Sequence, residues 1–154
     1  FCKDELKVIF KEKEVKQVNH SITNKKGTVR GMHFQYAPDC EVKMVKCIKG
    51  KILDVVIDIR KNSKTFLQVF SIELSEKNRK MIYIPEGFAH GFQALEDDTE
   101  LLYFHSNIYT PDNEGAFNIK DPLLNIKWPL DIMGVSKRDK EHKYVDNSFK
   151  GIEI

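Results

Sequence analysis

The stretch "KILDVVIDIR", residues 51–60, alternates its side chains with a period of two. In an extended chain, Asp54 and Val56 fall on one face, whereas Val55 and Ile57 fall on the other. An α-helix would instead group apolar residues three and four positions apart. The stretch therefore predicts a β-strand, and the rest of the fold is inferred from its neighbours.

Other β-rich runs surround this stretch at spacings of about ten residues, which is typical of the short strands of a sandwich or barrel. Turn-forming residues such as Gly50, Pro85 and Gly87 separate the runs. After Pro122 the pattern changes, and "GVSKRDKEH" (134–142) is expected to form a short helix or a turn. We therefore predict an all-β sandwich or barrel with a short C-terminal helical segment. The runs are "VKMVKCI" (42–48), "FLQVFSIELS" (66–75), "KMIYIPEGFAHGFQAL" (80–95) and "ELLYFHSNIY" (100–109).

The composition fits one globular domain. The chain has 154 residues, of which 41% are hydrophobic and 31% are charged, so a single domain spanning residues 1–154 is expected. A formal net charge of +2, with acidic and basic residues interleaved, argues against nucleic acid as a partner. No apolar run approaches the ~20 residues of a membrane helix, and no signal sequence is visible. We expect no membrane contact and a cytoplasmic location.

The cysteines and histidines lack the spacings of common metal sites. Cys2, Cys40 and Cys47 form no CxxC pair, so neither a disulfide framework nor a zinc site is expected. Many β-barrels hold a metal through a His-x-His pair and a nearby carboxylate. Glycine and glutamine flank His33 at positions 31 and 35, so this pair does not occur there. A metal-dependent cupin is therefore disfavoured, and no metal or cofactor is expected.

The stretch "GTVRGMHFQ" (27–35) places polar side chains in a run that otherwise suits the inside of a sheet. His33 and Gln35 alternate, so both can point into the same cavity. Histidine is the commonest proton-transfer residue, although a single histidine on a strand can also be structural. Arg30 suits a planar two-point contact with phosphate or carboxylate, or alternatively a surface salt bridge.

Three further runs carry candidate site residues. In "PEGFAHGF", a bend at Pro85 and Gly87 would present His90 on the following strand. Tyr103 and His105 alternate and share a face, where the phenol could act as a general acid or only as a packing residue. Lys43 shares a strand face with apolar residues, which indicates either a wet pocket or a lysine that reaches solvent at the strand's end.

Five motifs in series resemble the dTDP-4-dehydrorhamnose 3,5-epimerase family. The resemblance covers about residues 1–140 and implies a cupin-type jelly-roll enzyme that acts, without a metal or other cofactor, on nucleotide-linked 4-keto-6-deoxy sugars. It further implies a homodimer that inverts C3, C5 or both beside the ketone. The motifs are "RGMHFQ" (30–35), "DVVIDIRKNSKTF" (54–66), "IPEGFAHGF" (84–92), "YTPDNEG" (109–115) and "IKWPL" (126–130).

The resemblance also implies roles for individual residues. His33 stands where the family has its catalytic base, Asp139 where the base is oriented, and Tyr103 where the acid acts from the opposite ring face. Arg30 stands at the position that contacts the diphosphate. Such a pair suits epimerisation, because a proton must leave one face of the sugar and return on the other. The remaining substrate-binding residues implied are Gln17, Asn19, Gln35, Lys43, Asp54, His90, Tyr109 and Glu114.

Three departures from the family's pattern leave alternatives open. Ile108 stands where the family often has a tyrosine, and "IKD" (119–121) stands where it often has "WND", which affects the nucleotide base that is recognised. The chain begins with Phe1 rather than methionine, which indicates that an N-terminal strand of the natural protein is missing here. The alternatives are a 3,4-ketoisomerase, a sugar-binding cupin without catalysis and a metal-dependent cupin oxygenase.

Overall fold

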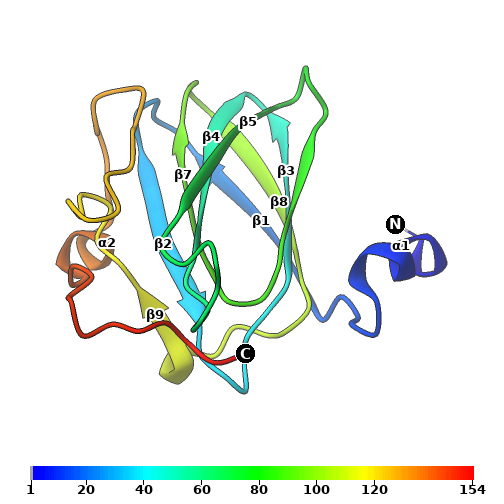
Figure 1. The fold of residues 1–154 in the computed structure, drawn as a ribbon. Helices are drawn as coiled ribbons and strands as arrows, with labels where there is room; N and C mark the ends of the chain where they lie inside the picture. The colour runs from blue at the N-terminus through cyan, green and yellow to red at the C-terminus, as the bar shows by residue number, and fades with distance from the viewer. Residues whose placement is uncertain (1) are drawn as a thin grey trace.

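The computed structural model describes residues 2–154 and contains two antiparallel β-sheets that face each other (Figure 1). The four-stranded sheet has the order β1 (Gln17–Thr23), β8 (Thr99–His105), β3 (Lys43–Lys49) and β6 (Met81–Ile84). The five-stranded sheet has the order β5 (Val69–Ser75), β4 (Lys51–Asp58), β7 (Phe88–Ala94), β2 (Val29–Gln35) and β9 (Glu114–Ala116). The predicted β-sandwich is confirmed.

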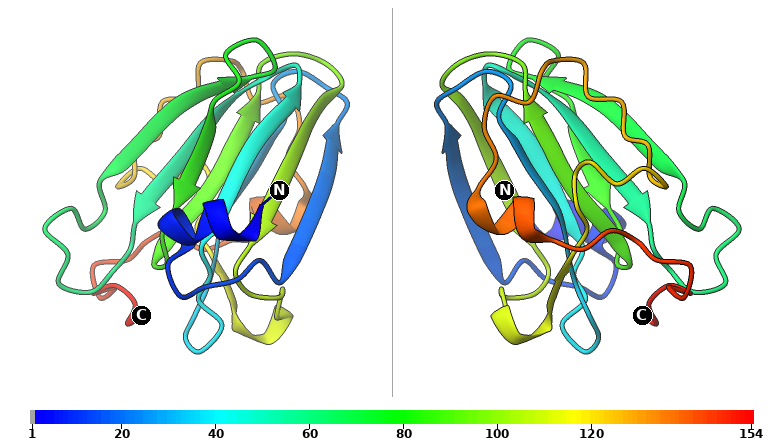
Figure 2. Two further views of the ribbon diagram at one scale, coloured as in Figure 1. Left: turned by 90° about the vertical axis from the view of Figure 1, so that its right-hand side faces the viewer. Right: turned by 90° about the vertical axis from the view of Figure 1, so that its left-hand side faces the viewer.

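In residues 2–154, three short helices accompany the sheets. Helix α2 (Lys137–Glu141) lies in the segment where a short C-terminal helix or turn was predicted. A 3₁₀ helix (Pro111–Asn113) precedes β9, and α1 (Lys3–Phe10) begins the described chain. The sequence did not predict α1, which lies beside the sandwich (Figures 1 and 2) and packs through Leu6 and Phe10. None of the helices in residues 2–154 is long and apolar enough to span a membrane.

Strand β4 has an apolar environment on both faces. Ile52 and Val56 point between the sheets, where they pack against Phe92 and Leu101. The opposite face, which includes Ile57, is covered by the C-terminal part of the chain, with Phe117, Leu124, Val145 and Ile152 in contact. Full burial of one such aliphatic side chain stabilises the fold by about 1.5–3 kcal/mol. The alternation predicted for residues 51–60 is confirmed, and both faces contribute to the core.

The space between the sheets changes from apolar to polar along the strands. On β8, the buried Leu101 belongs to the inter-sheet core, and Tyr103 lies at its margin. Two positions further on, His105 lines a cavity. On β3 the same change occurs between Val45, which is fully buried in the core, and Lys43, which lines the cavity. One end of the sandwich is therefore filled by side chains, whereas the other end is open to a ligand.

Strands β2 and β7 approach each other unusually closely. A Cβ atom placed on Gly31 would lie 2.5 Å from the Cα of Gly91, and φ of Gly31 is +133°. Only glycine tolerates both conditions. The pairing register between these strands shifts between Arg30 and His33. In a regular strand these two side chains would point to opposite faces, but the irregularity allows both to line the cavity.

Cys2, Cys40 and Cys47 are all free thiols. The run 80–95 forms two strands, β6 and β7, because the chain turns at Gly87, where φ is +77°. The β1 strand was not predicted as a strand, although its Gln17 and Asn19 were expected near the site.

Candidate active site

A cavity of about 330 Å³ lies between the two sheets and collects most of the predicted site residues. Ten of the twelve line it, and Asp54 and Asp139 are the exceptions. The ten are Gln17, Asn19, Arg30, His33, Gln35, Lys43, His90, Tyr103, Tyr109 and Glu114. Residues separated by almost a hundred positions are thus brought together by the pairing of the strands.

His33 on β2 forms a hydrogen-bonded pair with Asp139 on α2. The distance from His33 Nε2 to Asp139 Oδ1 is 2.9 Å, and the aspartate is 2% exposed. Ser136 caps α2 by accepting a hydrogen bond from the Asp139 amide, which fixes the helix that carries the carboxylate. Burial alone would raise the pKa of Asp139, but the hydrogen bond and charge of His33 hold it below its ordinary value. The carboxylate is therefore ionised and orients the imidazole.

Tyr103 stands on β8, in the sheet opposite His33. Its ring stacks on that of His105, with centroids 5.9 Å apart and an interplanar angle of 18°. The ring of His90 approaches it edge-on at 6.3 Å. Burial raises the pKa of the Tyr103 phenol well above its ordinary value. The phenol is therefore neutral at pH 7 and carries a proton that it can donate.

His90 on β7 has a buried carboxylate of its own. Its Nε2 lies 2.8 Å from Asp54 Oδ2, and Asp54 is fully buried. Asp54 was expected to contact the substrate, but the structure places it behind His90, outside the cavity lining. The alternation of β4 predicted the face on which Asp54 lies, but not its depth. Its position makes it a residue that orients His90.

Glu41 is a site residue that the sequence reasoning missed. Its Oε1 lies 3.0 Å from Lys43 Nζ, and its Oε2 lies 2.7 Å from His105 Nδ1. Burial opposes ionisation, but the hydrogen bond from His105 and the Lys43 charge lower the pKa of Glu41 overall. The spacing "EVK" was the available signal, because side chains two positions apart in an extended chain point to the same side, and Glu41 lies two residues before the start of β3 at Lys43. One carboxylate thus holds two basic side chains at the cavity wall.

The mouth of the cavity carries two arginines. Arg30 is exposed, and its Nη2 donates to the Ile22 carbonyl rather than to a carboxylate. Arg138 was not predicted, although it precedes Asp139 in "SKRD". It donates to Glu114 Oε2 at 2.8 Å and to the Tyr109 hydroxyl at 3.3 Å.

Gln35 uses its side chain mainly to fasten a loop. Its amide nitrogen donates to the carbonyls of Asp39 and Ile108, and its oxygen accepts from the Thr110 amide at 2.7 Å. Gln17 acts similarly, because its oxygen accepts from the Tyr109 amide. Both residues line the cavity, as predicted, and they also hold the chain that follows β8 against it.

The fold and the site define a β-sandwich enzyme of the proton-transfer class, with a carboxylate-backed histidine facing a neutral phenol across one cavity. The particular family follows from the sequence. The model of the dTDP-4-dehydrorhamnose 3,5-epimerase family matches residues 1–147, so the chain belongs to this family of isomerases.

Individual relatives agree with the family assignment. The chain is 39% identical over 137 residues to the dTDP-4-dehydrorhamnose 3,5-epimerase of Shigella flexneri. The matched region covers 88% of this chain and 75% of the relative. The corresponding Salmonella typhimurium protein is 44% identical over 114 residues, or 74% of this chain and 62% of the relative. The chain thus spans about two thirds of these relatives' length.

A solved structure agrees as well. The dTDP-6-deoxy-D-glucose-3,5-epimerase of Legionella pneumophila, in complex with dTDP-4-keto-L-rhamnose, superimposes with a TM-score of 0.90 at 31% identity. The match covers 100% of this chain and 84% of that one. The predicted family and the predicted jelly-roll fold are therefore confirmed.

Proposed function

We propose that the protein inverts a carbon beside the ketone of a dTDP-4-keto-6-deoxyhexose, at C3, C5 or both. The observation that carries this proposal is the position of His33 and Tyr103 on opposite sheets, both facing one cavity. Inversion needs a base on one face of the sugar ring and an acid on the other. The printed ligand of the Legionella relative, dTDP-4-keto-L-rhamnose, supports the substrate class.

In this proposal His33 is the base. Its Nε2 is engaged by Asp139, so Nδ1 is the nitrogen that takes the proton from the carbon beside the ketone. The electron pair of the broken C–H bond moves into an enolate, whose negative charge develops on the ketone oxygen. Lys43 Nζ is paired with Glu41 on one side, and its remaining N–H groups can donate hydrogen bonds that stabilise this oxygen.

Tyr103 is the acid in the second half of the reaction. The phenol gives its proton to the enolate carbon from the face opposite His33, and the carbonyl re-forms. Its raised pKa makes the phenol a reluctant donor to water but an adequate donor to a basic enolate carbon. The enzyme returns to its starting state when the phenolate takes a proton from solvent and His33 loses one.

The nucleotide diphosphate binds at the mouth of the cavity in this scheme. Arg30 is exposed and makes no carboxylate contact in the hydrogen bonds described, so its guanidinium is available for a two-point contact with phosphate oxygens. Arg138 contributes less, because Glu114 already balances its charge. Asn19 and Tyr109 are the neighbouring polar groups for the ligand.

The assembly and organisation of the protein form part of the same proposal. Residues 1–154 act as one domain of a cytoplasmic homodimer. Two apolar side chains on the edge strand β1 support the dimer, because Val18 and Ile22 are each 53% exposed.

Proton exchange tests the proposal directly. The protein is incubated with a dTDP-4-keto-6-deoxyhexose in deuterated buffer, and NMR assigns the carbons that take up deuterium. Deuterium at C3 or C5 with inversion is the expected result, and the labelled positions show which centres react. A 3,4-ketoisomerase would move the carbonyl, and a sugar-binding protein would bind the nucleotide without exchange. Either of these outcomes overturns the proposal.

A further inference from the structure

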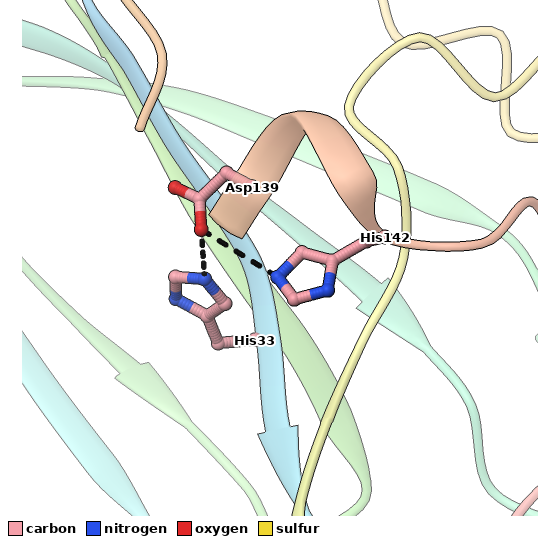
Figure 3. A group of neighbouring side chains, drawn as sticks. All are labelled: His33, Asp139 and His142. Carbon is pink, nitrogen blue, oxygen red and sulfur yellow. Dashed lines mark hydrogen bonds and ion pairs between the residues drawn. The ribbon is translucent and has the colours of Figure 1, made fainter. Parts of the chain in front are cut away.

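The side chains of His33, Asp139 and His142 converge beside helix α2 (Figure 3). His33 Nε2 and His142 Nε2 both approach Asp139 Oδ1, at 2.9 and 3.5 Å. One potential ligand atom from each of the three residues lies within 4.8 Å of the other two. In a tetrahedral zinc site with bonds of about 2.0–2.1 Å, ligand atoms are separated by about 3.3 Å. The cluster therefore has nearly the dimensions of a site with three protein ligands.

His142 has no other described role that would explain its position. It follows α2, three residues after Asp139, and it does not line the cavity. Its Nε2 is buried and has no hydrogen-bond partner in the described part of the chain. The two imidazole rings meet edge to face, with centroids 5.8 Å apart, and the Nε2 atoms of both approach the same oxygen of Asp139.

We propose that His33, Asp139 and His142 bind one Zn²⁺ or a similar divalent transition metal, and that this ion inhibits the enzyme. Two neutral imidazoles and a carboxylate are a common ligand set for zinc, with water at the fourth position. The helix cap at Ser136 and the hydrogen bond from the Gly31 amide to Asp139 Oδ2 hold the carboxylate in place. Partial exposure of the two histidine side chains, 24% and 19%, provides an entry path.

The inhibition follows from the tautomers of His33. A neutral imidazole carries one proton, and a metal bound through Nε2 leaves that proton on Nδ1. The Nδ1 atom then has no free lone pair and accepts no proton from the sugar. The ion would also bind the carboxylate of Asp139, which would then no longer orient His33. This consequence rests on the proposed function, whereas the binding of the metal does not.

Cobalt spectroscopy tests the binding independently of activity. Untagged protein is freed of metal with a chelator and titrated with Co²⁺, whose visible absorption is strong in tetrahedral sites. We expect saturation at one ion per chain and an affinity that falls about tenfold or more in His142→Ala, since removal of even a supporting residue has an effect of that size. His142→Phe keeps the ring packing and should behave like His142→Ala. The matched control is Lys137→Ala, whose side chain is 91% exposed on the same helix.

The inhibition is measured with Zn²⁺ in the deuterium-exchange assay. Zinc should suppress exchange in the unmodified protein and in Lys137→Ala at the same concentration. His142→Ala should keep its activity without metal and need about tenfold more zinc for the same suppression. Absence of the tetrahedral Co²⁺ spectrum, or an unchanged affinity in both His142 variants, overturns the site. If cobalt binds as expected but no variant shows exchange with any sugar nucleotide, the proposed function fails and the metal site stands.

Discussion

The two walls of the cavity use carboxylates differently. On the five-stranded sheet, His33 and His90 pair with two different buried aspartates, Asp139 and Asp54, at 2.9 and 2.8 Å. On the four-stranded sheet, the single carboxylate of Glu41 holds two basic side chains, and no hydrogen bond from Tyr103 to a carboxylate is described. A carboxylate behind a histidine orients the ring and fixes its tautomer, whereas a phenol next to a carboxylate would be a poorer acid for an enolate. We call the five-stranded wall the basic wall, because it carries the proposed base His33, and the four-stranded wall the acidic wall, because it carries the proposed acid Tyr103.

Removal of the proposed base from the basic wall should have the largest effect on activity. His33→Ala should lower the rate of deuterium exchange by a factor of about 10² to 10⁴, because a positioned general base is lost. The protein should still fold, but its melting temperature should fall by a few degrees, because the buried Asp139 loses its hydrogen bond with His33. Exchange followed by NMR and thermal unfolding measure the two quantities. Retention of most of the activity would assign the role of the base to His90 and would contradict its assignment to His33.

The acidic wall is tested by separating exchange from inversion. Tyr103→Phe keeps the ring packing against His105 but removes the proton donor. Exchange at the first carbon should persist, because His33 can return a solvent deuteron to the face that lost the proton. Inversion should fall by about 10²-fold or more. The measurement is the ratio of inversion to exchange by NMR in deuterated buffer.

His105 is the rival donor on the same wall and supplies the control. Its Nδ1 is held by Glu41, and its Nε2 has no partner among the described residues. His105→Ala should leave the ratio of inversion to exchange nearly unchanged. An equal loss of both rates in Tyr103→Phe, or a changed ratio in His105→Ala alone, would show that Tyr103 is not the acid.

The contribution of Glu41, the carboxylate shared by Lys43 and His105, to the free energy of unfolding should depend on pH. Because the pKa of Glu41 is lowered on folding, its stabilising contribution is complete above its unfolded pKa of about 4.3 and is lost as the pH falls through the folded value. Glu41→Gln should therefore reduce the free energy of unfolding by about 1–3 kcal/mol at pH 7. The difference from the unmodified protein should shrink below about pH 4. Urea unfolding at both pH values measures it.

A surface pair provides the matched control for Glu41. Glu100 lies 2.9 Å from His20, but the two side chains are 24% and 48% exposed. Glu100→Gln should cost less than about 1 kcal/mol at pH 7, as is usual for exposed pairs. Equal effects of the two substitutions would mean that burial does not strengthen the Glu41 contacts.

The sequence predicted the strands better than the contacts between them. Alternation in residues 51–60 is a local property, so both faces of β4 were predicted. Strand β1 was missed because most of its residues are exposed and its apolar pattern is weak. The partners of the site lie far apart, with 106 positions between His33 and Asp139 and 64 between Glu41 and His105. No local pattern contains such pairs; the family resemblance supplied the first, and only the structure supplied the second.

The smallest expected effect concerns Arg30 at the mouth, where both walls end. Arg30→Lys replaces a planar fork with a point charge, so the KM for the sugar nucleotide should rise several-fold while kcat stays nearly constant. Arg138→Lys is the matched comparison, because Glu114 already pairs with Arg138 at 2.8 Å and leaves less charge for a phosphate. Its KM should rise less. Steady-state kinetics of both variants provide the measurement. An unchanged KM in Arg30→Lys would mean that Arg30 serves only its contact with the Ile22 carbonyl, and a larger rise in Arg138→Lys would move the diphosphate site towards α2.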